Sequence, residues 1–349
     1  MTLQNENTGV GKGGIVLFAK RPGFTSFSSL FTIKHALETS KVGHTGTLDS
    51  FASGLLVVCT GPLTRLASRI TEFDKSYDAV IEFGRETDTL EWTGNMVRTA
   101  PFPGKDAVAA AVALFTGTLM QKPPLFSALH VNGERASSIA RSGRQADIPA
   151  RPVTVFGADI EEYLTASGGG VKAVRVKFSV SKGTYIRSLA RDIGESCGSA
   201  AHLAGLRRLS VGSFRLEDAA GAALLAPFTI ESVYKLIQTA APAKSAEKYV
   251  PDETELSLQN EVRAKLRPMT ENLAAECGFG ILHLREEYVR AFRNGKTLKK
   301  AMFAEEPAAE DAGRRTAVFS SDGEEFLGMI AHEAGGHYSY LFVIYAENA

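Results

Sequence analysis

The stretch KVGHTGTLDSFASGLLVVCTG, residues 41–61, joins a turn rich in glycine and threonine to an apolar segment. Residues 55–60, LLVVCT, form a short continuous apolar run, which is typical of a buried strand. One carboxylate, Asp49, stands at the junction of the turn and the strand. Aspartate beside threonine and glycine is most often a turn or capping residue. The same position can hold a catalytic carboxylate in a fixed direction at the bottom of a cleft, so both interpretations stay open here.

The segments on either side of this stretch predict strands that alternate with helices. Residues 14–23, GIVLFAKRPG, are typical of a buried strand that ends in a Pro-Gly turn, and residues 26–40 predict a helix with a Ser/Thr start. Residues 76–84 alternate apolar and polar side chains, which predicts a half-buried strand. Residues 105–119 are rich in alanine and predict an amphipathic helix. Because several strands are adjacent as in hairpins, the pattern favours an α+β fold with a mixed, largely antiparallel sheet.

Two later segments contain basic residues that could contact a phosphate or a carboxylate. Residues 121–143 begin with a double proline and predict an ordered excursion from the core with a short helix near its end. Residues 171–198 predict a strand, a sharp turn at 181–183 and then a helix, on which Arg187 and Arg191 share one face. These arginines can form a solvated helix face. Alternatively, they can contact phosphate, with one of them pairing with a buried carboxylate.

Composition indicates an ordinary globular protein of 349 residues with a core large enough for two domains. The formal net charge is zero. Residues 1–250 carry 28 Lys and Arg against 22 Asp and Glu, whereas residues 251–349 carry 11 against 17. Any polyanionic partner is therefore expected to meet the first 250 residues. No apolar run approaches a membrane span, and the N-terminus lacks the order of a secretory signal, so we expect no membrane partner.

The cysteines and the residues that could ligate a metal form no disulfide or metal-binding motif. Cys59, Cys197 and Cys277 lie far apart and in no CxxC pair, which predicts a protein of the reducing cytoplasm without a disulfide framework or a zinc site. His44 can be a base, a ligand, a phosphate donor or a structural loop residue, but no second ligand stands at metal-binding spacing. The motifs GxxxxGKS/T, GxGxxG after a strand and HExxH are absent from the sequence, so nucleotide and zinc-protease functions have no support.

Taken together, the motifs resemble the TruB-type tRNA pseudouridine synthases, bacterial relatives of dyskerin. The resemblance runs from about Gly13 to Phe214 and depends on several segments in the family's order. These segments are GHTGTLDSFASGLLVV, DKSYDAVIEFGRETDT, PPLFSALHVNGERA, and SKGTYIRSLARDIG followed by LRRLSVGSF. A coincidental match of that length and order is very improbable, so the resemblance favours the catalytic interpretation of Asp49.

The resemblance implies an enzyme that isomerises uridine 55 in the T-loop of tRNA without a cofactor or a metal, and we expect a monomer. It also implies a division of the chain into domains. A flexible N-terminus over residues 1–12 precedes a catalytic domain over residues 13–236, which contains an RNA-binding insertion at about 121–150. A linker over residues 237–270 then leads to a small β-rich domain over residues 271–349 that resembles a PUA domain.

Three residues are implied to be catalytic. Asp49 is the catalytic aspartate, which either adds covalently or abstracts a sugar proton. Tyr77, which the sequence alone leaves as a half-buried sheet aromatic or a stacking platform, is implied to stack on the extruded base and to serve the final proton transfer from carbon 5. Arg187 is implied to pair with Asp49 and to keep it ionised in a dry pocket.

Five further residues are implied to bind substrate. His44 is expected to contact the RNA loop beside the flipped nucleotide, and Lys20 to give support or a phosphate contact. The remaining candidates for phosphate contact are Lys182, Arg207 and Arg208, which stand in a segment with six basic and two acidic residues between 181 and 215.

The sequence also departs from the family's pattern. Thr93 stands where the family usually has an acidic residue and Glu91 where it has Asp, in a region that we expect to be structural. The acidic C-terminal part weakens the case for RNA contact there. The alternative to an enzyme is a non-catalytic RNA-binding or RNA-folding protein on the same fold, although pure binding would not need the set Asp49, Tyr77 and Arg187. A synthase directed to other RNAs by a guide complex is a third possibility, which the short insertion disfavours.

Overall fold

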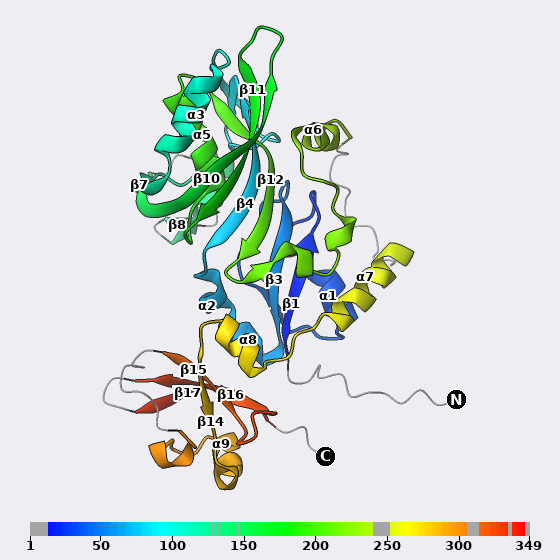
Figure 1. Ribbon diagram of the computed structural model, residues 1–349, viewed down its shortest axis with the longest axis vertical. Helices are drawn as coiled ribbons and strands as arrows, with labels where there is room; N and C mark the ends of the chain where they lie inside the picture. The colour runs from blue at the N-terminus through cyan, green and yellow to red at the C-terminus, as the bar shows by residue number, and fades with distance from the viewer. Residues whose placement is uncertain are drawn as a thin grey trace.

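The computed structural model of this chain is built around a large sheet with helices on both faces and a smaller sheet beside it (Figure 1). It describes residues 13–127, 129–131, 133–144, 147–239, 252–305, 314–333 and 337–345. The N-terminal segment that was predicted to be flexible, residues 1–12, lies outside this range.

The large sheet has the strand order β1-β3-β12-β4-β11-β10-β7, with β2 paired to β3 and β13 paired to β12. Its strands are β1 (Ile15–Lys20), β2 (Val42–His44), β3 (Ser53–Thr60), β4 (Lys75–Phe83), β7 (Gly117–Gln121), β10 (Arg151–Thr165), β11 (Val171–Val180), β12 (Ala201–Val211) and β13 (Phe214–Arg215). All its pairings are antiparallel except that of β12 with β3. The predicted α+β class with a mixed, largely antiparallel sheet is confirmed.

Strand β4 is more deeply buried than the predicted half-buried strand, because helices cover both faces of the sheet at this point. Ala79 and Ile81 belong to the core under α3 (Lys105–Leu114) and α5 (Ile186–Ser196), whereas Val80 packs on the opposite face toward α6 (Ile230–Thr239). Figure 1 shows these helices on either side of the central strands. The alternation of apolar and polar side chains along β4 therefore does not indicate that one face of this strand is exposed to solvent.

Two predicted helices are shorter in the structure. Helix α1 spans Leu30–Ala36 rather than residues 26–40, because the preceding residues form tight turns in which Thr25 accepts hydrogen bonds from Ser28 and Ser29. Helix α3 ends at Leu114, and the rest of the segment predicted to be helical turns into β7 through Gly117 at φ +101°. The strands β10 and β12 were not predicted.

The predicted excursion over residues 121–143 is confirmed. It contains β8 (His130–Val131), β9 (Glu134–Arg135) and the short helix α4 (Ala136–Arg141). The remaining short elements of this half are α2 (Ala67–Thr71), the hairpin β5 (Arg85–Thr87) with β6 (Met96–Thr99), and 3₁₀ turns at Gly61–Leu66, Leu216–Asp218 and Ala222–Leu224.

The segment predicted to be a linker, residues 237–270, contains regular structure. It begins inside α6 and includes α7 (Glu253–Ala264), whose side chains Leu258 and Val262 pack with α1 in one core. Asp252 caps α7 by accepting a hydrogen bond from the backbone of Glu255. Helix α7 of this segment therefore packs against α1, which itself packs on the large sheet. Residues 240–251 lie outside the described range.

The C-terminal part is β-rich, as predicted. A four-stranded sheet has the order β14 (Gly280–His283), β15 (Arg315–Phe319), β16 (Phe326–His332) and β17 (Tyr338–Val343). The helices beside it are α8 (Glu271–Glu276) and α9 (Val289–Arg293), with 3₁₀ turns at Glu286–Tyr288 and Lys300–Met302. Within this part, residues 289–293 form a helical turn that Phe292 anchors in the core. Residues 306–313, 334–336 and 346–349 of this part lie outside the described range.

The small sheet shares a hydrophobic core with the large one. Leu63, Leu66 and Ile70, which follow β3, belong to the same buried cluster as Met329 and Phe342 of the small sheet. This shared core fixes the C-terminal sheet below the end of β1 and β3 (Figure 1). Across the helices that the structure describes, none is long and apolar enough to cross a membrane.

A histidine clamped between two carboxylates predicts a pH-dependent stability of the C-terminal part. The His283 ring nitrogens lie 2.8 Å from Glu271 Oε1 and 2.7 Å from Glu305 Oε1. The hydrogen bond to Glu271, followed by that to Glu305, raises the pKa of His283. The protonated clamp is thus present below about pH 6.5, the unfolded pKa of histidine, and is lost as the pH rises through the higher folded pKa.

We expect the free energy of unfolding to fall over that pH window by about 1 kcal/mol at most, since the carboxylates are partly exposed. His283→Gln removes this dependence, whereas His337→Gln, at an exposed histidine, retains it. Chemical denaturation from pH 5.5 to 8.5 measures the difference. Identical pH profiles for wild type and His283→Gln contradict the clamp.

Candidate active site

The three residues predicted to be catalytic line one cavity of about 480 Å³. Asp49 comes from the loop between β2 and β3, Tyr77 from β4, and Arg187 from the first turn of α5. These segments are far apart in the sequence and meet because β3 and β4 both pair with β12, on which α5 packs. The other lining residues include Gly46, Thr47, Leu48, Lys75, Phe126, Ser127, Arg135, Arg141, Tyr185, Leu206 and Arg208.

Asp49 and Arg187 form a two-pronged ion pair. The distance is 3.0 Å between Arg187 Nε and Asp49 Oδ2, and 3.1 Å between Nη2 and Oδ1. The Arg187 side chain is only 7% exposed, and its remaining donors bind the backbone oxygens of Thr89 and Phe126, each at 2.9 Å. Such paired contacts fix direction as well as distance. The carboxylate, 33% exposed, is thus held in one orientation while it still faces the cavity.

The turn before Asp49 is held by side chains from two other segments. Ser26 accepts a hydrogen bond from the Leu48 backbone N–H at 2.8 Å and donates one to the Leu48 oxygen at 3.0 Å. Arg208, only 2% exposed, donates to the backbone oxygens of Leu55 and Gly46 at 2.7 and 3.1 Å. The guanidinium of Arg208 thus holds the turn, and its phosphate contact stays a prediction.

Gly54 shows why this turn tolerates no side chain at the start of β3. It has φ +110°, and a Cβ built on it lies 2.3 Å from the backbone oxygen of Arg208. Only glycine therefore permits the close parallel approach of β3 to β12. This approach places Arg208 under the loop that carries Asp49.

Lys20, which was predicted to give support or a phosphate contact, is completely buried at the end of β1. Its Nζ donates to the backbone oxygens of Ala52, Arg21 and Ser50 at 2.6, 3.1 and 3.3 Å. Burial lowers its pKa to about 7, against the opposing effect of nearby Asp49. The alternative role, support, agrees with these contacts, which tie β1 to the residues that follow Asp49.

Arg207, which was also predicted to bind substrate, projects from the opposite face of the sheet and is not among the residues that line this cavity. Successive side chains of a strand alternate, and its neighbours Leu206 and Arg208 are the ones that line the cavity. Arg207 donates to Ser53 Oγ at 3.1 Å and lies 4.9 Å from the centre of the Phe228 ring.

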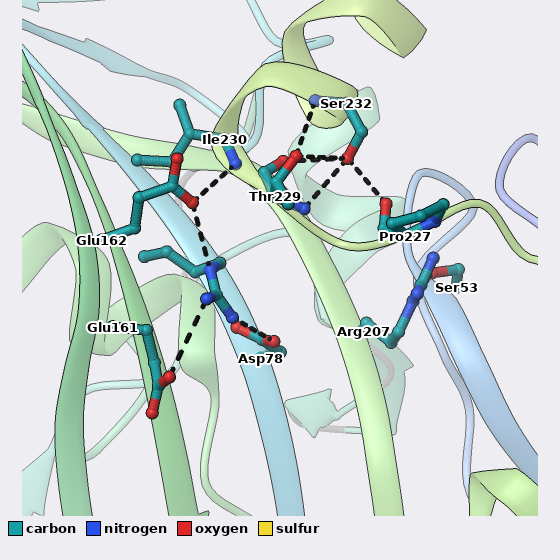
Figure 2. Close-up of polar contacts among 10 residues, drawn as sticks. Ser53, Asp78, Glu161, Glu162, Arg207, Pro227, Thr229, Ile230 and Ser232 are labelled. Atoms are coloured by element: carbon teal, nitrogen blue, oxygen red, sulfur yellow. Dashed lines mark hydrogen bonds and ion pairs between the residues drawn. The ribbon is translucent and has the colours of Figure 1, made fainter.

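Figure 2 shows Arg207 on the side of the sheet where α6 begins. It shares that side with the ion pairs that join Asp78, Glu161 and Glu162 through Arg175. Glu162 also accepts a hydrogen bond from the backbone of Ile230 at 3.1 Å. These contacts hold α6 against the sheet and have no direct access to the cavity.

Lys182 and His44, which were also predicted to contact substrate, lie near the cavity but not beside the Asp49–Arg187 ion pair. Lys182 is exposed after β11 and pairs with Glu72. His44 lies on β2, where burial, assisted by Arg208, lowers its pKa. Its Nδ1 is buried and has no hydrogen-bond partner among the residues that the structure describes. Within the same part of the chain, no cluster of three or more His, Cys, Asp or Glu could hold a metal ion.

The loop before Glu91 contributes to the site, which was not predicted from the sequence. Residues 87–91 were expected to be structural, yet the Thr89 oxygen accepts a hydrogen bond from Arg187. Glu91 is also close enough to matter electrostatically, since burial and then the charge of Asp49 raise its pKa. Leu90 between them has φ +60°, an uncommon backbone for a leucine, which shapes this loop around the guanidinium.

The fold matches solved structures along nearly the whole chain. A crystal structure of a Cbf5–Nop10–Gar1 complex matches 96% of this chain and 86% of that chain with a TM-score of 0.62 at 22% identity. A structure of an H/ACA RNP bound to a substrate RNA containing 2′-deoxyuridine matches 97% of this chain and 86% of that chain with a TM-score of 0.62 at 20% identity. At these identities the comparison shows the fold alone.

Sequence comparison gives the family. The model of the TruB family pseudouridylate synthase N-terminal domain matches residues 34–186. The tRNA pseudouridine synthase B of Treponema denticola is 40% identical over 304 residues, 82% of this chain and 85% of that protein. The protein of the same name from Treponema pallidum is 35% identical over 361 residues, 95% of this chain and 98% of that protein. This chain therefore belongs to the TruB family of pseudouridylate synthases, as its motifs indicated.

Proposed function

We propose that this protein converts uridine 55 in the T-loop of tRNA to pseudouridine. Relatives named tRNA pseudouridine synthase B that match most of this chain support a tRNA substrate. The observation that carries the proposal is the Asp49–Arg187 ion pair in the wall of a cavity that Tyr77 also lines.

The uridine must leave its stack to reach Asp49, at a cost of the order of a few kcal/mol. A cavity of about 480 Å³ has room for a uracil base and its ribose. The Tyr77 ring offers a stacking surface that replaces the lost neighbours. Arg187 holds the Asp49 carboxylate in one direction toward the cavity through two charge-assisted hydrogen bonds.

The reaction conserves every atom of the nucleotide. The bond between ribose C1′ and uracil N1 breaks, the base turns over, and C5 bonds to C1′; the C5 proton leaves and N1 is protonated. Asp49 begins the reaction either by covalent addition or by abstraction of a sugar proton. Tyr77 serves the final proton transfer from C5. These steps use only groups of the protein and the RNA.

The parts outside the cavity have proposed roles in holding the RNA. Arg135 and Arg141 of the insertion line the cavity mouth and supply positive charge toward the RNA backbone. Lys182 and His44 extend that surface on the side of the catalytic turn. The β-rich C-terminal part is proposed to be the family's small PUA-like domain, with the division from the catalytic domain falling between α6 and α8.

Mapping pseudouridine in an unmodified tRNA transcript tests the proposal. We expect purified protein to create a carbodiimide-dependent primer-extension stop at position 55, and no stop in a matched transcript with cytidine at that position. A protein that binds the transcript tightly but leaves it unmodified supports the non-catalytic alternative. A stop only at other uridines contradicts the assignment to position 55.

A further inference from the structure

Three exposed phenylalanines and two basic residues form a patch on and before α1. Phe24, Phe27 and Phe31 are 44%, 63% and 46% exposed. With Arg21 and Lys34 they constitute what we call the aromatic–basic patch. Large aromatic side chains contribute strongly to contact energy and are seldom left exposed together without a partner. The proposed chemistry at Asp49 uses none of these five residues.

The cations of the patch lie near the phenylalanine rings. The Arg21 guanidinium carbon is 4.9 Å from the Phe24 ring centre, and Lys34 Nζ is 5.4 and 5.8 Å from the centres of Phe27 and Phe31. Phe27 and Phe31 are themselves 6.1 Å apart in an edge-to-face arrangement. Each distance is within the range of a cation–π or aromatic contact. The patch is therefore preorganised, with positive charge beside flat apolar surface.

The patch is connected by hydrogen bonds to the segment that carries Asp49. The Gly23 N–H donates to the Ser50 oxygen at 2.8 Å, and Ser26 binds the Leu48 backbone in both directions. Leu48 lines the cavity. An RNA whose nucleotide enters the cavity thus passes close to the loop that presents Phe24 and Phe27.

The charges of α1 favour a polyanion over a neutral partner. Its first turn has no acidic residue, and its last turn carries Lys34 and His35. The acidic group that packs against this helix is Glu255 of α7, which accepts a hydrogen bond from Thr32 at 2.6 Å. That contact occupies the side of α1 that faces α7, where Leu258 and Val262 also pack.

We propose that the aromatic–basic patch binds an unpaired nucleotide of the substrate RNA next to the flipped uridine. The base stacks on Phe27 or Phe31, and Lys34 and Arg21 contact the adjoining phosphates. Alternation of aromatic rings and cations is the arrangement by which proteins hold unpaired nucleotides without reading their sequence. The inference rests on the proposed function, because it takes the RNA that enters the cavity as the ligand.

Binding of unmodified tRNA transcript to the double variant Phe27→Ala/Phe31→Ala tests the stacking. We expect roughly tenfold weaker binding by filter retention, from the loss of one stacked base. The single-turnover rate at saturating enzyme should stay within about twofold of wild type, because neither ring lines the cavity. The matched control is Phe156→Ala, which removes a ring that is 54% exposed on β10 and should bind as wild type does.

A salt titration of Lys34→Gln tests the phosphate contact. We expect the slope of log affinity against log salt to become shallower by about 0.7 to 0.9 relative to wild type. Equal affinity and equal slope for both patch variants and wild type overturn the proposal. So does self-association of the wild type in sedimentation that the double variant abolishes without a change in RNA affinity, since the patch is then a protein interface.

These outcomes separate the patch from the proposed function. If wild type modifies position 55 and the patch variants bind as it does, only the patch proposal fails. If wild type neither binds nor modifies tRNA, the proposed function and the patch proposal fail together. If the wild-type protein binds tRNA without modifying it, and the double variant binds tRNA more weakly, the patch proposal is supported and the proposed catalytic function is contradicted.

Discussion

Asp49→Asn abolishes the conversion of uridine 55, with a single-turnover rate lower than that of wild type by roughly four orders of magnitude, the scale of loss when a central catalytic group is removed. The amide has the shape of the carboxylate but can neither attack the ribose nor take a proton from it. Binding of tRNA should change by only a few-fold, since the cavity, Tyr77 and the basic residues of the insertion remain. Carbodiimide mapping over a time course gives the rate, and filter retention gives the affinity.

The fold of this variant needs its own check, because the substitution leaves the Arg187 guanidinium without its charge partner. Breaking a buried ion pair costs about 3–5 kcal/mol, and the 33% exposure of Asp49 reduces that figure here. Circular dichroism and a thermal melt distinguish a folded, inert protein from an unfolded one. Asp106→Asn, at an exposed aspartate on α3, is the matched control and should react normally. A folded Asp49→Asn protein that reacts at the wild-type rate rules out the proposed role.

Local sequence predicted the elements of this site better than it predicted their surroundings. The apolar run at residues 55–60 and the helix that carries Arg187 follow from composition and periodicity alone. That the loop before this run and the helix line one cavity does not follow from them, because it depends on the strand order of the sheet. The family resemblance implied one site for the motifs of three distant segments, but it did not give that order.

The sequence did not show where a basic side chain serves the backbone. Lys20 and Arg208 both donate to backbone oxygens in the interior, although basic residues usually face solvent or a polyanion. Arg207 adjoins Arg208 in the sequence, but alternation along the strand sends it to the other face. Burial and register of this kind come from long-range pairing, and a single sequence does not contain them. β12 was missed for the same reason, since its run of mixed residues gives no clear period.

Arg187→Met lowers the conversion rate by about two to three orders of magnitude while the fold persists. The methionine fills a similar volume, but Asp49 loses both of its charge-assisted hydrogen bonds and the oxygens of Thr89 and Phe126 lose their donor. The carboxylate then has no fixed direction toward the bound nucleotide. Single-turnover mapping measures the rate, and circular dichroism with a thermal melt measures the fold.

A charge-conserving variant separates the pairing of Asp49 from a general loss of packing. Arg187→Lys, which restores the charge without the two-pronged geometry, should recover part of the rate. Arg191→Met, one turn further along α5, removes an arginine that pairs with Asp192 and should react as wild type does. An Arg187→Met protein that is folded and converts uridine 55 at the wild-type rate contradicts the proposed role of the ion pair.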